Sequence, residues 1–220
     1  MCSAAAYVAG ADLVIFDFDG TLADSEDLLT ELVLQTLRDK QLSPAIQSRA
    51  IGKLIGLPLL QVLSAASGAP AGELHEVASH YRHIADSPEV VARFRLFPGV
   101  ATTLRTLADR GKRLAIATSK SRAITQKILV AVGLDDLVGE VVGGDCVRHG
   151  KPHPEAVERL LAQAKCSSRR AAVVGDTTFD VEMGKGAGAI TIAATYGMHE
   201  REALATKEPD AFIDDIGELI

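Results

Sequence analysis

Short apolar runs that alternate with helix-length segments constrain the fold of this chain more than any other feature. Four runs have the length and β-branched content of buried strands, and they span residues 13–16, 114–117, 171–174 and 189–193. Weaker runs occur at 140–142 and 211–213. Amphipathic segments of helical length lie between them, at about 100–109, 121–132, 154–164 and 181–187. Strands that alternate with helices predict an α/β fold, with a parallel sheet covered by helices on both faces.

One stretch, from about residue 24 to residue 94, interrupts this alternation. It has no β-rich run, but apolar residues recur at helical spacing, and glycines and prolines divide it into four or five short helices. We therefore predict a core formed by residues 1–24 and 95–220, with an all-helical insertion at residues 25–94. Because the insertion starts directly after the loop of the first strand, we expect it to act as a lid that excludes water from a site.

Composition excludes several classes of protein. The chain has 23 Lys and Arg against 29 Asp and Glu, a net charge of −6, which argues against a dedicated nucleic-acid binder. Its apolar stretches are too short to span a membrane, and its first residues lack the basic and apolar regions of a signal peptide. We expect a cytoplasmic monomer or homodimer with no nucleic-acid or membrane partner.

Acidic residues follow two of the apolar runs directly. Asp17 and Asp19 come after the first run, and Asp176 and Asp180 come after the third. In parallel sheets, ligands bind beyond the carboxyl ends of the strands. Neighbouring carboxylates repel one another unless a cation or a shared proton is present, and Mg²⁺ prefers oxygen ligands of this kind. A single Asp after a strand more often caps a helix or a turn, but four at neighbouring strand ends favour a metal site.

Hydroxyl groups and a lysine are expected at the same edge of the sheet. Thr118 and Ser119 follow the second run and precede a helix, so they can bind a phosphate at its N-terminus or, equally well, cap that helix. Lys151 lies between Gly150 and Pro152, in a constrained loop that favours a fixed direction for its ammonium group. A cation there would balance the charge of the acids and of a phosphate.

Four motifs in order resemble those of the haloacid dehalogenase-like hydrolase superfamily. They are Asp17-Phe18-Asp19-Gly20-Thr21-Leu22, Thr118-Ser119-Lys120, Lys151-Pro152-His153-Pro154 and Gly175-Asp176-Thr177-Thr178-Phe179-Asp180. With a helical insertion after the first motif, the chain is most similar to the phosphoglycolate-phosphatase-like branch, and residues 51–59 resemble the cap loop of that branch. The resemblance implies a Rossmann-like core with a helical cap inserted after the first strand.

The resemblance also implies catalytic roles. Asp17 would be the nucleophile that forms an aspartyl phosphate, and Asp19 would act as general acid and then general base. Thr118, Ser119 and Lys151 would bind the phosphoryl oxygens.

A metal site and substrate contacts are implied in the same way. Mg²⁺ would be held by Asp17, by the backbone carbonyl of Asp19 and by Asp176, with Asp180 orienting the site or binding the ion through water. In the cap, Lys53 and Arg49 are candidates to contact the rest of the substrate.

The expected activity is therefore Mg²⁺-dependent hydrolysis of a phosphate monoester of a small metabolite. Three alternatives stay open: a sugar-phosphate mutase similar to β-phosphoglucomutase, an inorganic pyrophosphatase, and a non-catalytic phospho-acceptor or binding module. Asp19 argues against the last of these, and against the dehalogenases and phosphonatases of the superfamily, which lack an acid at that position. Ser119 stands where the phosphoglycolate-like branch often has Asn, so the substrate is not assigned.

Overall fold

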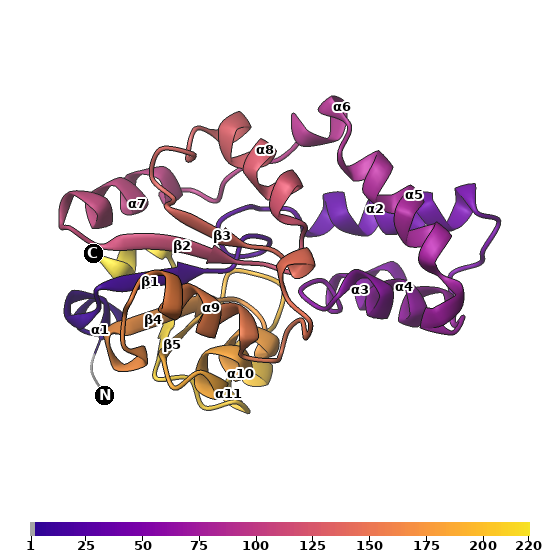
Figure 1. The fold of residues 1–220 in the computed structure, drawn as a ribbon. Helices are drawn as coiled ribbons and strands as arrows, with labels where there is room; N and C mark the ends of the chain where they lie inside the picture. Colours follow the sequence, from indigo (N-terminus) through magenta and orange to yellow (C-terminus); the bar gives the residue numbers. More distant parts are fainter. Residues whose placement is uncertain (1–2) are drawn as a thin grey trace.

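Six parallel strands form the centre of the molecule in a computed structural model that describes residues 3–220 (Figure 1). The strand order is β3-β2-β1-β4-β5-β6. The strands are β1 (Leu13–Phe16), β2 (Arg113–Ala117), β3 (Glu140–Val142), β4 (Ala171–Gly175), β5 (Ile190–Ala194) and β6 (Ala211–Ile213). The chain builds outward from β1 to β3 and then returns to β4 on the other side of β1. That reversal opens a crevice beyond the carboxyl ends of β1 and β4, where sheets of this order bind ligands.

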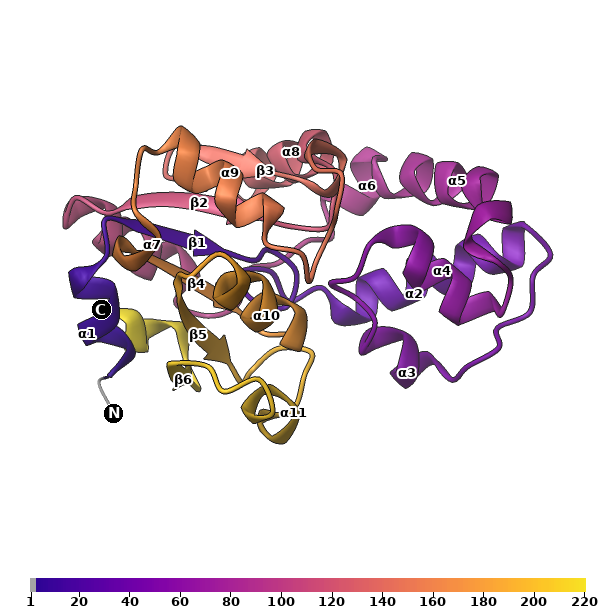
Figure 2. The same ribbon diagram turned by 60° about the horizontal axis from the view of Figure 1, so that its bottom comes forward.

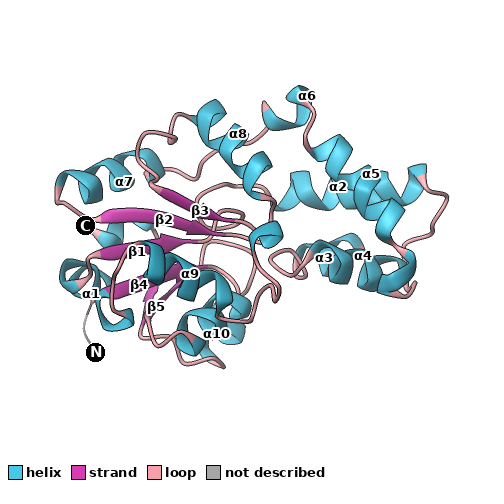
Figure 3. Ribbon diagram, in the orientation of Figure 1, coloured by secondary structure: helices cyan, strands magenta, loops and turns pink. Residues whose placement is uncertain are grey.

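Helices cover both faces of the sheet (Figure 3). Alternate residues of a strand point to opposite faces, so Val14 and Phe16 pack in one apolar cluster and Leu13 and Ile15 in another. The first cluster includes residues of α1 (Ala4–Gly10), α7 (Val100–Asp109) and α8 (Arg122–Val132). The second includes residues of α9 (Glu155–Gln163) and α10 (Thr178–Gly186), and α11 (Arg201–Ala205) packs beside α10. The predicted α/β fold class with its Rossmann-like parallel sheet is confirmed.

A group of helices between β1 and α7 extends beyond the carboxyl ends of the strands (Figures 1 and 2). These helices, which we call the helical segment, are α2 (Glu26–Asp39), α3 (Ser48–Gly52), α4 (Leu59–Ser67), α5 (His75–Ala85) and α6 (Pro88–Val91). They enclose an apolar cluster of their own, which contains Val33, Leu37, Leu63 and Val77. The two connections to the sheet run side by side, because the Asp24 amide donates a hydrogen bond to the Arg95 carbonyl at 2.9 Å.

The observed elements differ from the sequence expectation mainly at short helices. α1 and α11 were not predicted, since helices of five to seven residues carry too little periodicity to recognise. α10 begins at Thr178, earlier than the apolar pattern indicates, because Thr177 caps the helix. Within residues 3–220, each helix is too short or too polar to cross a membrane.

Candidate active site

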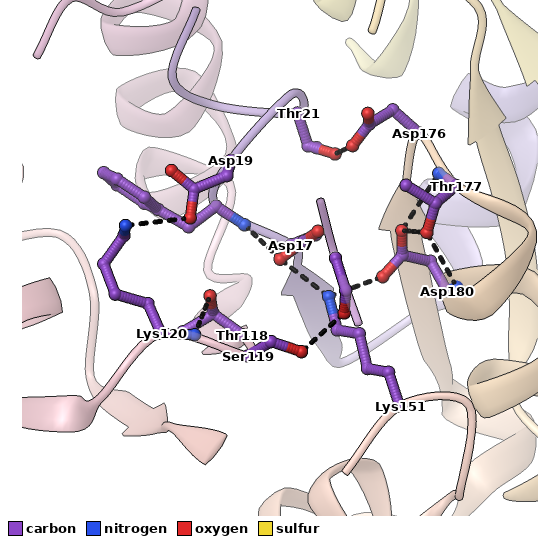
Figure 4. A network of polar contacts seen from close by, with 12 residues as sticks. Asp17, Asp19, Thr21, Thr118, Ser119, Lys120, Lys151, Asp176, Thr177 and Asp180 are labelled. Atoms are coloured by element: carbon purple, nitrogen blue, oxygen red, sulfur yellow. Dashed lines mark hydrogen bonds and ion pairs between the residues drawn. The ribbon is translucent and has the colours of Figure 1, made fainter. Parts of the chain in front are cut away.

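Three carboxylates meet in the crevice between β1 and β4. Asp17 directly follows β1, and its amide donates to the Val174 carbonyl of β4 at 2.9 Å. Asp176 follows β4, and Asp180 lies in the first turn of α10. All three side chains are buried, and each offers an oxygen atom within 4.8 Å of those of the others. Figure 4 shows them around a common centre.

Hydrogen bonds fix the two acids that follow β4. The Thr21 hydroxyl donates to Asp176 Oδ1 at 2.6 Å, and the Met198 amide donates to Asp176 Oδ2 at 2.8 Å. Asp180 Oδ2 accepts hydrogen bonds from the Thr177 amide at 3.0 Å and from the Thr177 hydroxyl at 2.6 Å. In return, the Asp180 amide donates to the Thr177 hydroxyl at 3.4 Å. The two residues thus form the capping box that starts α10, so the helix N-terminus and the position of the acid are set together.

Lys151 places its ammonium group among the carboxylates. Its Nζ lies 2.7 Å from Asp17 Oδ1 and 2.6 Å from Asp180 Oδ1, and its side chain is buried (Figure 4). Burial alone would lower the pKa of Lys151, but the two carboxylates outweigh burial and raise this pKa above its usual value. The lysine is therefore charged at neutral pH.

The remaining charge of the site calls for a cation. Burial, followed by repulsion from neighbouring acids, raises the pKa of Asp17 well above its usual value and that of Asp176 to about 7. Asp17 Oδ2 is buried and accepts no hydrogen bond from residues 3–220. One ammonium group cannot neutralise three carboxylates. The atoms that the triad offers as metal ligands are all carboxylate oxygens. The residues therefore fit a divalent metal ion, which would keep the acids ionised.

Asp19 is separate from this triad and lies closer to the helical segment. Its Oδ1 accepts a hydrogen bond from the Ser25 hydroxyl at 2.8 Å, and its Oδ2 lies 3.3 Å from Lys120 Nζ. The Lys120 ammonium also lies 5.0 Å from the centre of the Phe94 ring. Asp19 lines a cavity of about 820 Å³ between the helical segment and the sheet, so its carboxyl group faces the space that the organic part of a substrate would occupy.

Thr118 and Ser119 do not cap α8, because the Ser121 hydroxyl accepts the hydrogen bond from the Ile124 amide instead. Thr118 is buried at the end of β2, where its hydroxyl accepts a hydrogen bond from the Lys120 amide at 3.2 Å and is available to a phosphate oxygen. The Ser119 hydroxyl donates to the Gly56 carbonyl of the helical segment at 2.5 Å. Phosphate binding by Ser119 stays a prediction.

Lys53 and Arg49 lie away from the cavity, at a contact between the helical segment and the sheet. The Lys53 ammonium donates to the Met198 carbonyl and lies 3.3 Å from Glu200 Oε1, and Arg49 lies 3.9 Å from the same oxygen. Neither side chain lines the 820 Å³ cavity. Their predicted contact with substrate is untested, and the observed contacts give them a part in positioning the helical segment.

Glu155 is a residue that the sequence did not reveal. Its carboxylate accepts hydrogen bonds from the amides of Arg148 at 3.1 Å and His149 at 3.0 Å, and its Oε1 pairs with Arg159 at 2.8 Å. It thereby holds the loop that delivers Lys151. An acid in the first turn of a helix is common for dipole reasons alone, so nothing in the sequence marked this one.

These features define a class: an α/β protein with a Rossmann-like sheet whose crevice is arranged to bind a metal ion and a phosphate group. Residues 14–194 match the haloacid dehalogenase-like hydrolase family, and the chain belongs to this family.

Several relatives are similar to the chain over nearly its whole length. "Probable phosphatase IndB" of Dickeya dadantii is 36% identical, covering 94% of this chain and 91% of that protein. The phosphoglycolate phosphatase of Rhodospirillum rubrum is 33% identical, covering 94% of this chain and 88% of that protein. The pyrophosphatase PpaX of Anoxybacillus flavithermus is 31% identical, covering 94% of each protein. A crystal structure of a haloacid dehalogenase-like hydrolase from Bacteroides fragilis superposes with a TM-score of 0.89 at 28% identity, covering 96% of this chain and all of that one.

Proposed function

We propose that this protein is a Mg²⁺-dependent phosphatase that hydrolyses the phosphate monoester of a small metabolite through a phosphorylated Asp17. The observation that carries the proposal is the buried triad of Asp17, Asp176 and Asp180, with Lys151 beside it and with an Asp17 Oδ2 that accepts no hydrogen bond from the described part of the chain. Family membership and relatives named as phosphatases support it. The composition fits a cytoplasmic monomer or homodimer.

The first chemical step forms a bond between Asp17 and phosphorus. A carboxylate oxygen of Asp17 attacks in line while the bond to the ester oxygen breaks, which gives an aspartyl phosphate and an alkoxide. Lys151 and Thr118 hold the equatorial phosphoryl oxygens. Mg²⁺, held by Asp17, Asp176 and the backbone carbonyl of Asp19, with Asp180 beside it, would neutralise charge on the transferring group.

Asp19 moves the protons in both steps. Its carboxyl group protonates the departing alkoxide, and the resulting carboxylate removes a proton from the water that attacks the phosphoryl group. Inorganic phosphate and free Asp17 result. The Ser25 hydroxyl and the Lys120 ammonium hold the Asp19 carboxylate in a fixed orientation.

The alternatives are less well supported. A pyrophosphatase is among the relatives, but the basic side chains of the cavity that are not paired with Asp17, Asp19 or Asp180 are exposed, so a second phosphate would meet only solvated partners. A phospho-acceptor module would need its phosphorylated aspartate to persist, whereas Asp19 is placed to promote hydrolysis of that group. A mutase would use the same residues, and converting a sugar 1-phosphate to its 6-phosphate without release of phosphate would identify it.

Replacing the nucleophile tests the proposal directly. We expect Asp17→Asn to reduce Mg²⁺-dependent hydrolysis of p-nitrophenyl phosphate to background, while thermal unfolding shows a melting temperature unchanged or raised, because a buried charge is removed. Asp24→Asn is the matched control, since Asp24 is exposed nearby. EDTA should abolish activity and Mg²⁺ should restore it. Full activity in Asp17→Asn or in EDTA would contradict the proposal.

A further inference from the structure

The cavity next to Asp19 extends well beyond the space needed for a phosphate group. It measures about 820 Å³ and is lined by both Asp19 and Lys151, so it is continuous with the proposed site of phosphoryl transfer. Pockets of this size hold drug-sized molecules. The organic group of a phosphate ester bound at Asp17 would enter it, because Asp19 must contact the leaving oxygen.

The helical segment contributes a mostly apolar wall, whose polar side chains are Gln61, Tyr81 and Arg82. A half-buried run in the loop before α4 and in its first turn faces the cavity, formed by Leu57, Pro58, Leu59 and Leu60. Deeper residues of α2, α4 and α5 complete this wall, namely Leu29, Val33, Val62 and Ala85. Ile124 and Val147 continue it on the sheet side. Water against such a wall is unfavourable, and an apolar group that displaces it gains free energy in proportion to the area covered.

The cations near the cavity are poorly placed to hold a second anionic group. Lys120 is paired with Asp19, and Lys151 is paired with Asp17 and Asp180. Among the described residues of the helical segment, Arg82 is the single charged side chain that lines the cavity, and it is exposed. On the sheet side, Arg148, His149 and His153 also line the cavity, and all three are exposed. A substrate with a carboxylate or a second phosphate at this end would therefore find only solvated partners beside a large apolar surface.

We propose that the substrates are phosphate monoesters of alcohols that carry an extended apolar group, rather than small dianionic acids or pyrophosphate. This inference rests on the proposed phosphatase activity and deepens it. The phosphate and the ester oxygen bind at Asp17 and Asp19, and the apolar group covers the wall formed by Leu57–Leu60. Specificity then comes from hydrophobic contact rather than from paired charges.

A series of n-alkyl phosphates isolates this contact, because the leaving alcohols from propyl to octyl have nearly the same acidity. We expect kcat/KM with Mg²⁺ to rise about fourfold per added methylene until the cavity is filled, as burial of a methylene group predicts. Inhibition constants of n-alkylphosphonates, which cannot be hydrolysed, should fall in parallel. A flat or falling series would overturn the inference, as would a higher kcat/KM for phosphoglycolate or pyrophosphate than for octyl phosphate.

Two matched variants assign the effect to the cavity wall. Leu60→Asn places an amide on the wall and should reduce the rise in kcat/KM per methylene. Leu42→Asn is the control, because Leu42 is also a half-buried leucine of the helical segment but does not line the cavity. This variant should keep the same rise as the wild type. Unchanged melting temperatures show that both variants fold. If Leu60→Asn lowers the melting temperature, the more conservative Leu60→Ala replaces it. An equal gain per methylene in the wild type and in the folded Leu60 variant would overturn the assignment.

Failure of this inference can be told apart from failure of the proposed function. If propyl to octyl phosphates, p-nitrophenyl phosphate and phosphoglycolate are all resistant to hydrolysis, the phosphatase proposal fails. If they are hydrolysed at equal rates, or less well than phosphoglycolate, the phosphatase proposal stands and the apolar substrate class is wrong. Arg82→Ala adds a second criterion. It should leave kcat/KM of the alkyl phosphates unchanged, but it would lower kcat/KM of a substrate whose far carboxylate binds Arg82.

Discussion

Asp176 illustrates how narrowly a single carboxylate is positioned in this site. Both of its oxygens accept short hydrogen bonds, from Thr21 and from the Met198 amide. Gly20 and Gly197 pass so close to the carboxylate that a Cβ atom on either would lie within 2.5 Å of Asp176 Oδ2. Glycine at these positions is therefore a consequence of where the acid sits.

Gly20→Ala should destabilise the protein by about 1–3 kcal/mol, because Gly20 has a φ of +84° and a Cβ there would lie 2.2 Å from Asp176 Oδ2. Asp176 cannot move away without losing its hydrogen bonds. Urea unfolding measures the effect, and Gly10→Ala is the control, since a Cβ at Gly10 meets no atom within 4 Å. Equal stability of the two variants would show that the contact is easily relieved.

The chemical groups of the site could be predicted from sequence, but their partners could not. Asp17 and Asp176 could be identified because polar residues after buried strands collect at one edge of a parallel sheet, and Lys151 because Gly150 and Pro152 constrain its loop. Local sequence does not show that Ser119 bonds to the Gly56 carbonyl, 63 residues away, since such contacts depend on how the helical segment packs.

At the scale of secondary structure, the start of α9 holds the loop that carries Lys151. Glu155 binds the amides of Arg148 and His149, which precede the lysine, while Arg159 on the next turn of α9 pairs with the same carboxylate. The helix thus fixes both ends of a short loop. The sequence predicted α9 itself to within a residue at each end, because its apolar periodicity is clear.

Glu155→Gln should lower stability in a pH-dependent manner. Hydrogen bonds from the backbone amides of His149 and Arg148 lower the pKa of Glu155 from 4.5 to about 2. A carboxyl group with a lowered pKa stabilises the fold fully above the unfolded value, and this contribution is lost as the pH falls from about 4.5 to about 2. Urea midpoints of the wild type and variant should therefore differ most near neutral pH and converge toward pH 2.

The neighbouring acid on the same helix gives a matched control. Glu158 is exposed, and its side chain makes no hydrogen bond or ion pair with the described residues. We expect Glu158→Gln to have a small effect that does not change with pH in this way. A stability difference for Glu155→Gln that stays constant from pH 7 to pH 3 would mean that charge is not the cause.

At the scale of the whole molecule, the helical segment meets the sheet around the cavity, and Leu28, Leu29 and Leu32 of α2 belong to the apolar cluster of the sheet. The helical segment has its own cluster and joins the sheet through adjacent connections near Asp24 and Arg95. Polar contacts then set its position, including Ser119 to Gly56 and Lys53 to Met198. The sequence indicated an all-helical insertion, but the shape and lining of the cavity depend on this packing and could not be predicted from periodicity.

Lys53→Ala should lower kcat/KM by a similar factor for all substrates, about two- to tenfold, which corresponds to the loss of one hydrogen bond that positions the helical segment. Steady-state kinetics on ethyl phosphate, octyl phosphate and phosphoglycolate measure it. Lys185→Ala, on the outer surface of α10, is the control. A loss confined to phosphoglycolate would instead support direct contact between Lys53 and the substrate.

Asp180 divides its two oxygens between starting α10 and holding Lys151. We therefore expect a replacement there to disturb both the start of the helix and the position of the lysine. The wall formed by Leu57–Leu60 makes no contact with Lys151 or the carboxylates that is known to position them. It packs on the apolar cluster of the helical segment. Substitutions in that wall are therefore expected to change which organic group is accepted, without displacing the carboxylates and the lysine at the end of the sheet.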